Sequence, residues 1–182
     1  MSITLVLGGA RSGKSAFAEQ FAEQSGRPVV YIATATGGDV EMASRIAHHR
    51  ARRPAAWQTI EAPLALAEAL GQHATADTCV LVDCLTLWLS NLLFENGNAN
   101  TGADVIDPGP RFAQQRDAML ALLPQLPGEI VLVSNEIGFG VTPLGAVTRF
   151  FVDEAGRLNQ RVATLAQRVR LVVAGCPIAI KG

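Results

Sequence analysis

The chain has 182 residues, of which 49% are apolar, and a formal net charge of -1. This length suits one domain with a sizeable core, and the balanced charge gives no reason to expect a nucleic-acid surface or a polybasic membrane anchor. No apolar run reaches the roughly 20 residues that span a bilayer, and the N-terminus shows no signal-peptide pattern. The cysteines, Cys79, Cys84 and Cys176, form no C-x-x-C pair, which favours a reducing cytoplasm over a disulfide frame or a zinc site.

Short apolar runs alternate with helical patterns along the chain. The apolar runs predict strands at 3–7, 29–33, 78–82, 130–134 and 171–174, with a short edge strand at 178–180. The helical patterns predict helices at 15–24, 41–53, 63–70, 85–94, 111–123 and 144–168, the last with a candidate break at Gly156. This order predicts a single α/β domain over residues 1–182, built as a doubly wound, mostly parallel sheet with helices on both faces. The stretch Glu95–Pro110 is rich in Gly, Asn, Asp and Pro and predicts a flexible surface loop.

A glycine-rich motif lies between the first predicted strand and the first predicted helix. It matches G-x-x-x-x-G-K-[ST] in full, with Gly8, Gly9, Ala10, Arg11, Ser12, Gly13, Lys14 and Ser15. The glycines let successive N–H groups converge on phosphate oxygens, the lysine neutralises the β and γ phosphates, and the serine hydroxyl reaches Mg²⁺. The only other lysine is Lys181, which argues against a chance match. The motif predicts a nucleoside triphosphate site in a fold of the P-loop NTPase type.

A carboxylate ends the third predicted strand, as the second element of such a site requires. Asp83 follows Cys79–Val82 and is placed to hold Mg²⁺ directly or through water. The alternative is that Asp83 caps the helix that follows it. The two roles are compatible, and the sequence leaves both open.

The predicted helix at 41–53 carries two of the three histidines. Met42, Ile46 and His49 share one face, whereas His48 lies on the polar stripe with Arg45 and Arg52. Neighbouring arginines disfavour the charged imidazole and leave a lone pair for attack on phosphorus. By itself, however, a His-His pair among arginines is usually a solvated helix face.

Seven motifs span nearly the whole chain: GGARSGKS at 8–15, YIATA at 31–35, E-M-x-x-R-I-x-H-H at 41–49, R-P-x-x-W at 53–57, VDCLTLWLSNLLF at 82–94, SNEIGFGVTP at 134–143 and R-F-F-x-D-x-x-G-x-x-N-Q-x-x-A at 149–163. Together they resemble the bifunctional adenosylcobinamide kinase / adenosylcobinamide-phosphate guanylyltransferase family of cobalamin biosynthesis. The first motif is generic to P-loop enzymes. The His-His motif and the last two motifs are specific to this family.

The resemblance implies roles for individual positions. His48 matches the nucleophile that takes GMP from GTP as a histidine phosphoramidate, and Gly8–Ser15 match the triphosphate loop. Further nucleotide contacts are implied for Ala33, Thr34, Ala35, His49, Arg50, Ala51, Arg52, Glu61 and Asp83. A carboxylate suits guanine because it accepts from N1–H and the 2-amino group together, and Glu61 and Asp83 stay alternatives for that role. Catalysis is expected from His48 and Lys14, and metal binding from Ser15 and Asp83.

The implied chemistry has two halves. ATP or GTP phosphorylates the hydroxyl of the aminopropanol arm of adenosylcobinamide. His48 then attacks the α-phosphorus of GTP and expels pyrophosphate, and adenosylcobinamide phosphate displaces His48 to give adenosylcobinamide-GDP. The resemblance also implies Mg²⁺ as the cofactor and a homo-oligomer, with a trimer as the expectation.

Two other functions fit the phosphate loop alone: a simple kinase of a small alcohol, and a nucleotide-dependent switch or ATPase module acting on a protein partner. A second polar cluster follows the fourth predicted strand, where open α/β sheets bind ligands. Its residues, Asn135, Glu136, Gly138 and Gly140, are either corrinoid or loop-positioning residues, or a glycine turn before a capped helix.

Overall fold

The computed structural model describes residues 2–36, 53–95 and 106–182. The strands are β1 (Ser2–Gly8), β2 (Val29–Ala33), β3 (Gln58–Glu61), β4 (Cys79–Asp83), β5 (Glu129–Asn135), β6 (Arg168–Val173) and β7 (Cys176–Lys181). The helices are α1 (Lys14–Gln24), α3 (Leu66–His73), α4 (Leu85–Phe94), α5 (Pro110–Leu122) and α6 (Ala146–Leu165), with a short 3-10 turn, η2 (Leu123–Gln125).

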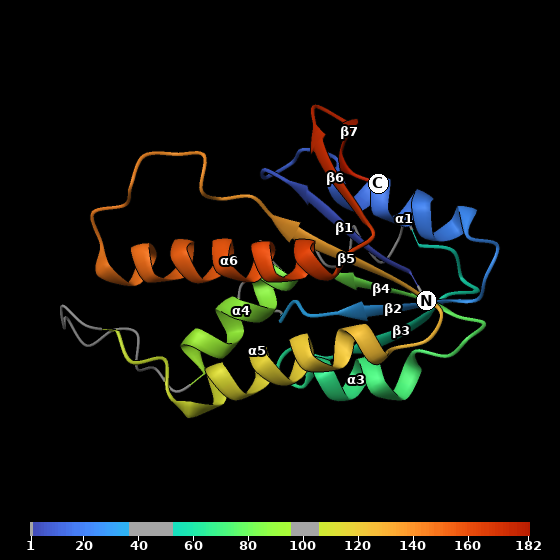
Figure 1. Cartoon of the computed structure of the whole chain (residues 1–182), viewed down its shortest axis with the longest axis horizontal. Coiled ribbons are helices and arrows are strands. Elements are labelled where there is room, and N and C mark those ends of the chain that lie inside the picture. The colour runs from blue at the N-terminus through green and yellow to red at the C-terminus, as the bar shows by residue number, and fades with distance from the viewer. Residues whose placement is uncertain (1, 37–52, 96–105) are drawn as a thin grey trace.

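The described strands form one sheet in the order β3-β2-β4-β5-β1-β6-β7 (Figure 1). Every neighbouring pair is parallel except β6 and β7, which form an antiparallel hairpin at one edge. The carboxyl ends of β1, β2, β4 and β5 therefore meet along one side of the sheet. In open α/β sheets this side is where ligands bind.

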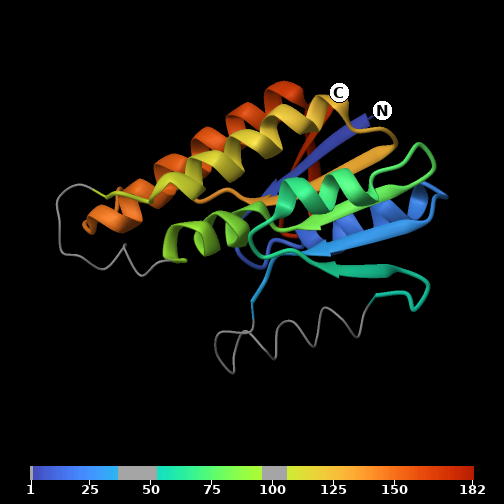
Figure 2. The ribbon, with the colours of Figure 1, turned by 90° about the horizontal axis from the view of Figure 1, so that it is seen from below.

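Helices cover both faces of the sheet (Figure 2). On one face α3, α4, α5 and α6 pack on the apolar side chains of the strands, with Trp88, Leu89 and Leu132 fully buried among them. On the other face α1 packs through Ala18 and Ala22 on a smaller cluster from β1, β2, β4 and β5. The near-continuous apolar strands follow from this double cover, because both of their faces are buried. Within the described residues, no helix is long and apolar enough to cross a membrane.

The structure confirms the predicted α/β class and the mostly parallel sheet. The predicted strand at 29–33 and the predicted helix at 85–94 match β2 and α4, and most other boundaries shift by one to three residues. The predicted helix at 41–53 lies outside the described residues, except for Arg53, and residues 96–105 of the predicted loop do as well. At the loop's end, Ile106 packs against the core, and Pro110 already begins α5.

Two expectations are corrected. The candidate break at Gly156 is wrong, because α6 runs without interruption through that residue. A strand, β3, was not predicted: only Ile60 of its four residues packs on the core, and the other three are exposed. Such an edge strand is defined by its backbone pairing with β2, which leaves no apolar pattern to read.

Candidate active site

The phosphate loop links β1 to α1 as the motif predicts. Arg11 has a φ of 56° and Gly13 a φ of 93°, so the chain passes twice through the left-handed region within three residues. Such turns direct successive N–H groups into one concavity that suits an anion. The close packing also needs Gly8, because a Cβ there would collide with Ser12 Oγ and lie 2.7 Å from the carbonyl oxygen of Val172.

The start of α1 is open to a ligand. Gly13 occupies the N-cap position and supplies no side-chain cap, and no acidic residue lies in the first turn. The N–H groups of that turn, at Lys14 and Ser15, therefore remain available to phosphate oxygens. Lys14 Nζ donates to the Gly9 carbonyl oxygen at 3.2 Å, which holds its charge over the loop.

The turn between β6 and β7 braces the phosphate loop from outside. Gly175 N–H donates to the Ser12 carbonyl oxygen at 2.8 Å, and a Cβ on Gly13 would lie 3.1 Å from the Gly175 Cα. Gly175 itself has a φ of 80°, which favours glycine. The sequence analysis missed this contact because the two glycines are 162 positions apart, by their numbers in the chain.

Asp83 lies at the carboxyl end of β4 and is half-buried. Its Oδ2 accepts a hydrogen bond of 2.9 Å from the Tyr31 hydroxyl on β2. Burial raises the pKa of Tyr31 far above its usual range, and the neighbouring Asp83 adds to that shift, so Tyr31 acts as a protonated donor. The Arg53 guanidinium stacks on the Tyr31 ring, with Cζ 3.4 Å from the ring centroid. Arg53, Tyr31 and Asp83 thus form a contiguous row, which we call the row Arg53–Tyr31–Asp83.

Thr34 ties the ends of β2 and β4 together. Its Oγ1 donates to the Cys84 carbonyl oxygen and accepts from the Cys84 N–H, both at 2.8 Å, and its own carbonyl oxygen accepts from Asn91 Nδ2 at 2.7 Å. Burial, with Asp83 as the next cause, raises the pKa of Cys84 to about 12, so this thiol is not a nucleophile. The nucleotide contacts expected of Ala33, Thr34 and Ala35 stay predictions, and Thr34 already has a structural role.

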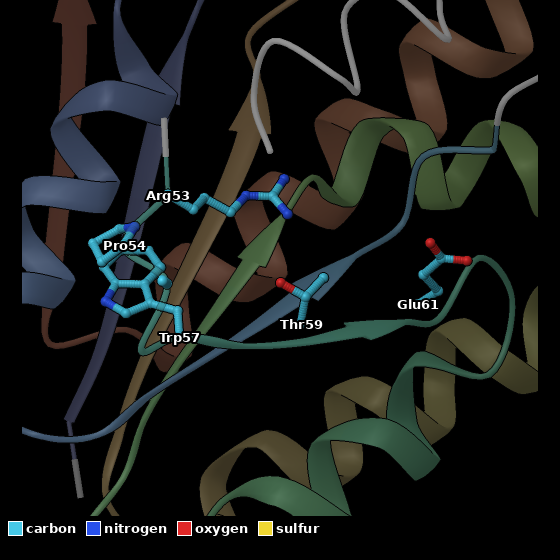
Figure 3. Close-up of a pocket in the computed structure, with 6 residues that line it drawn as sticks. Arg53, Pro54, Trp57, Thr59 and Glu61 are labelled. Atoms are coloured by element: carbon cyan, nitrogen blue, oxygen red, sulfur yellow. The ribbon is translucent and has the colours of Figure 1, made fainter. Parts of the chain in front are cut away.

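A pocket of about 440 Å³ lies along β3 (Figure 3). It is lined by Arg53, Pro54, Ala55, Trp57, Thr59 and Glu61. In Figure 3 the Arg53 side chain extends over the strands toward Thr59, and Glu61 stands at the far end of β3. Apolar and aromatic walls with a few charged groups are typical of small-molecule sites. Of the two candidate carboxylates, Glu61 lines this pocket, whereas Asp83 is hydrogen-bonded to Tyr31.

Arg53 is the residue of this region that the sequence analysis did not single out by itself. Within the described part of the chain, its Nε and Nη1 are buried without a hydrogen-bond partner. Buried N–H groups without an acceptor are costly, so an anion near these two nitrogens would be favourable. The R-P-x-x-W motif was the only sequence signal for it.

His48, the expected nucleophile, lies outside the described residues, as do His49, Arg50, Ala51 and Arg52. In the described ranges no group of three His, Cys, Asp or Glu side chains is arranged to hold a metal ion. Ser15 and Asp83 nevertheless offer the oxygen ligands that Mg²⁺ prefers. Mg²⁺ in nucleotide sites takes few protein ligands and completes its shell with phosphates and water.

Comparison with known proteins identifies the family. Residues 4–180 match the family described as cobinamide kinase / cobinamide phosphate guanyltransferase. The chain belongs to this family. The chain is 54% identical over 178 residues to the bifunctional adenosylcobalamin biosynthesis protein CobP of Pseudomonas aeruginosa, covering 98% of this chain and 96% of that protein. It is 40% identical over 179 residues to the bifunctional adenosylcobalamin biosynthesis protein CobU of Salmonella typhimurium, covering 97% and 98%.

Solved structures of other proteins share the fold. The RadB recombinase matches with a TM-score of 0.51 at 15% identity, covering 93% of this chain and 73% of that chain. The type III secretion ATPase EscN matches with a TM-score of 0.53 at 12% identity, covering 95% of this chain and 43% of that chain. These likenesses confirm the predicted P-loop NTPase-type fold. Family membership makes the chain a bifunctional kinase and guanylyltransferase, and it does not favour the simple-kinase or switch alternatives.

Proposed function

We propose that one triphosphate site serves both reactions and that, in the guanylyltransferase reaction, His48 carries GMP from GTP to adenosylcobinamide phosphate. The observation that supports this is the row Arg53–Tyr31–Asp83, which runs from the pocket on β3 to the strand ends beside the phosphate loop. A nucleotide with its base in the pocket and its phosphates on the loop would lie along this row. The chemical groups suit the two ends of a nucleotide. The pocket offers a carboxylate and an aromatic ring to the base, and the phosphate loop offers N–H groups to the phosphates.

In the guanylyltransferase half, Glu61 accepts from the guanine N1–H and 2-amino groups. A His48 nitrogen attacks the α-phosphorus of GTP, the bond to the bridging oxygen breaks, and pyrophosphate leaves with that electron pair. The phosphate of adenosylcobinamide phosphate then displaces His48 and forms adenosylcobinamide-GDP. Arg53 supplies a positive group beside this path, and its unpaired nitrogens suit phosphate oxygens.

In the kinase half, the loop N–H groups and Lys14 hold the triphosphate in line with the hydroxyl of adenosylcobinamide. Mg²⁺ neutralises charge on the phosphates when it is bound, and Ser15 and Asp83 are the residues that would hold it. Positioning and charge neutralisation account for most of such a reaction, because phosphoryl transfer needs little covalent chemistry from the protein. ATP and GTP are both suitable donors, since the loop contacts only phosphates.

Covalent labelling tests the role of His48. Incubation with α-labelled GTP and Mg²⁺ should give a protein adduct that is stable in base and labile in acid, as a phosphorus–nitrogen bond is. His48→Ala should abolish the adduct and GMP transfer and leave phosphorylation of adenosylcobinamide largely intact. His49→Ala is the matched control and should still form the adduct. Label that persists on the His48→Ala protein, or maps to His49, would contradict the assignment.

We further propose a homo-oligomer, with three copies as the expected number, in the cytoplasm. Three large apolar side chains stand in solvent between β5 and α6: Phe139 is 82% exposed, Val141 94% and Leu144 98%. In Figure 1 this segment arches away from α6. Exposed apolar patches mark interaction sites, and we propose that another copy of the chain binds to and buries this one. Light scattering should give a multiple of the 19.2 kDa chain mass, and Leu144→Ser should shift the measured mass toward that of the monomer.

The proposed location in the cytoplasm is supported by Cys176, whose free thiol is exposed and therefore fits a reducing compartment.

A further inference from the structure

Residues at and around the ends of β1 and β5 carry buried polar atoms without partners. Within the described residues, Ser12 Oγ, Asn135 Oδ1 and Asn159 Oδ1 are buried and make no hydrogen bond. Asn159 is only 5% exposed. Leaving such atoms unpaired is costly, and native proteins retain them mainly where a ligand or water completes them. The three atoms belong to the phosphate loop, β5 and α6, and Asn135 is in contact with both of the other segments.

Asn135 lies beside the phosphate loop. It pairs with Gly8 in the register of β1 and β5, and the next residue, Glu136, donates its N–H to the Gly8 carbonyl oxygen at 3.1 Å. Adjacent strands are about 4.8 Å apart, so the Asn135 backbone runs directly next to the start of the loop. Ser12 Oγ occupies the space over Gly8 where a Cβ would be.

The side chain of Asn135 belongs to the same face of the sheet as the phosphate loop. Along β5, Val131 and Val133 pack on the face covered by α1, whereas Ile130 and Leu132 pack on the other face. Alternation therefore places Asn135 on the α1 face. β5 lies between β1, which leads into the loop, and β4, which ends at Asp83. Asp83 pairs with Val133, so Asn135 is two residues beyond Asp83 in the direction of the carboxyl ends of the strands.

The backbone of Asn135 is fixed from the opposite face. Its N–H donates to Thr86 Oγ1 at 2.7 Å, and its carbonyl oxygen accepts from Asn159 Nδ2 at 3.1 Å. Asn159 is in turn held by α6, which the buried Glu154 ties to α5 through Arg116 at 2.7 Å. These two hydrogen bonds use the backbone groups of Asn135, and Oδ1 of its carboxamide has no partner within the described residues.

We propose that Asn135 is a catalytic residue of the kinase half, contacting the reacting groups, and that Asn159 is the residue that positions it. This inference rests on the proposed use of the phosphate loop in that half. A carboxamide offers an acceptor and two donors in one plane. Nδ2 donates to an oxygen of the transferred phosphoryl group, and Oδ1 accepts from the attacking hydroxyl of the substrate.

Phosphoryl transfer in the kinase half does not require Asn135 to act as a base. A lone pair of the hydroxyl oxygen forms the new bond to the γ-phosphorus. The bond from the γ-phosphorus to the bridging oxygen breaks, and its electrons stay on the nucleoside diphosphate. The hydroxyl proton passes to an oxygen of the transferred phosphoryl group and then to solvent. The carboxamide orients both partners and stabilises the charge of the transition state, where one such donor contributes about 100-fold in kcat.

The test compares the two activities of the full-length protein. Asn135→Ala should lower kcat for adenosylcobinamide phosphorylation about 100-fold, with the KM for the nucleotide and the rate of adduct formation from α-labelled GTP within about threefold. Asn159→Ala should lower the same kcat about tenfold and also spare the adduct. Ser134→Ala is the matched control, because Ser134 lies on the same strand and faces Thr86 on the other side, and it should keep both activities.

Asn135→Asp keeps the shape of the side chain and replaces the donor with an oxygen, so it serves if the alanine variant fails to fold. It should remain low in kinase activity while folding normally. A folded Asn135 variant with kinase turnover within about threefold of the wild type would overturn the proposal. So would an equal fall of both activities together with the melting temperature, since that marks a structural role. A wild-type protein that forms the adduct without phosphorylating adenosylcobinamide would overturn the kinase half and this inference with it.

Discussion

The phosphate loop and the pocket on β3, which we propose to be two parts of one nucleotide site, are built in opposite ways. The loop is eight consecutive residues, Gly8–Ser15, from the end of β1 to the start of α1, and it offers mainly backbone N–H groups. The pocket is lined by side chains from the chain before β3 and from β3 itself, and the row Arg53–Tyr31–Asp83 connects it to the carboxyl end of β4. The loop is local, whereas the pocket depends on how β2, β3 and β4 pair.

This difference separates two kinds of recognition. Backbone N–H groups bind any triphosphate, because phosphates are common to all nucleotides. Side chains such as Glu61 and Trp57 can distinguish one base from another, since donors and acceptors differ between bases. The loop should therefore control both reactions, and the pocket should control the choice of nucleotide.

The largest effect is expected at Lys14. Lys14→Ala should lower both kinase and guanylyltransferase rates by about 100- to 1,000-fold, because each reaction needs the triphosphate charge neutralised. Separate assays of the two rates measure this. Lys181→Ala is the matched control, since the only other lysine donates to the carbonyl oxygens of Ala163 and Thr164, away from the loop. Near-normal turnover in either half would show that this half uses another site.

A smaller and selective effect is expected at Glu61. Glu61→Gln should raise the KM for GTP in adduct formation about 10- to 100-fold, because a well-placed pair of hydrogen bonds to a base is worth about 1–3 kcal/mol. Phosphorylation of adenosylcobinamide with ATP should change little. Glu68→Gln, at an exposed acid on α3, controls for the loss of one negative charge. Equal losses with GTP and ATP would place the base elsewhere.

The smallest effect is expected at Tyr31. Tyr31→Phe removes the donor to Asp83 and keeps the ring on which Arg53 stacks. The loss of one hydrogen bond to a carboxylate should cost about 1–2 kcal/mol of unfolding free energy and lower Tm by about 2–6 °C, with both activities reduced only a few-fold. Tyr31→Leu, which also removes the ring, should cost more. If the two variants were equally stable, the stack on Arg53 would contribute nothing.

Most of the fold could be read from the chain because parallel strands that are buried on both faces are short apolar runs. β2 matched its expected bounds for this reason, and α4 matched because its mostly apolar sequence is buried along most of its length. β3 was not predicted because an exposed edge strand has no such apolar run. The predicted break at Gly156 was wrong because a glycine is tolerated within a long, well-packed helix.

The sequence by itself determined the phosphate loop and, through its motifs, the family, because all of that information lies in consecutive residues. Only the tertiary structure placed Tyr31 against Asp83, Arg53 on Tyr31, Gly175 on Ser12, and Asn159 on Asn135. Each of these contacts joins residues far apart in the chain, and sheet pairing and helix packing bring them together. The N-E-x-G-x-G and D-x-x-G-x-x-N-Q motifs were visible from the start, and the physical reason to connect them is a hydrogen bond that the fold alone creates.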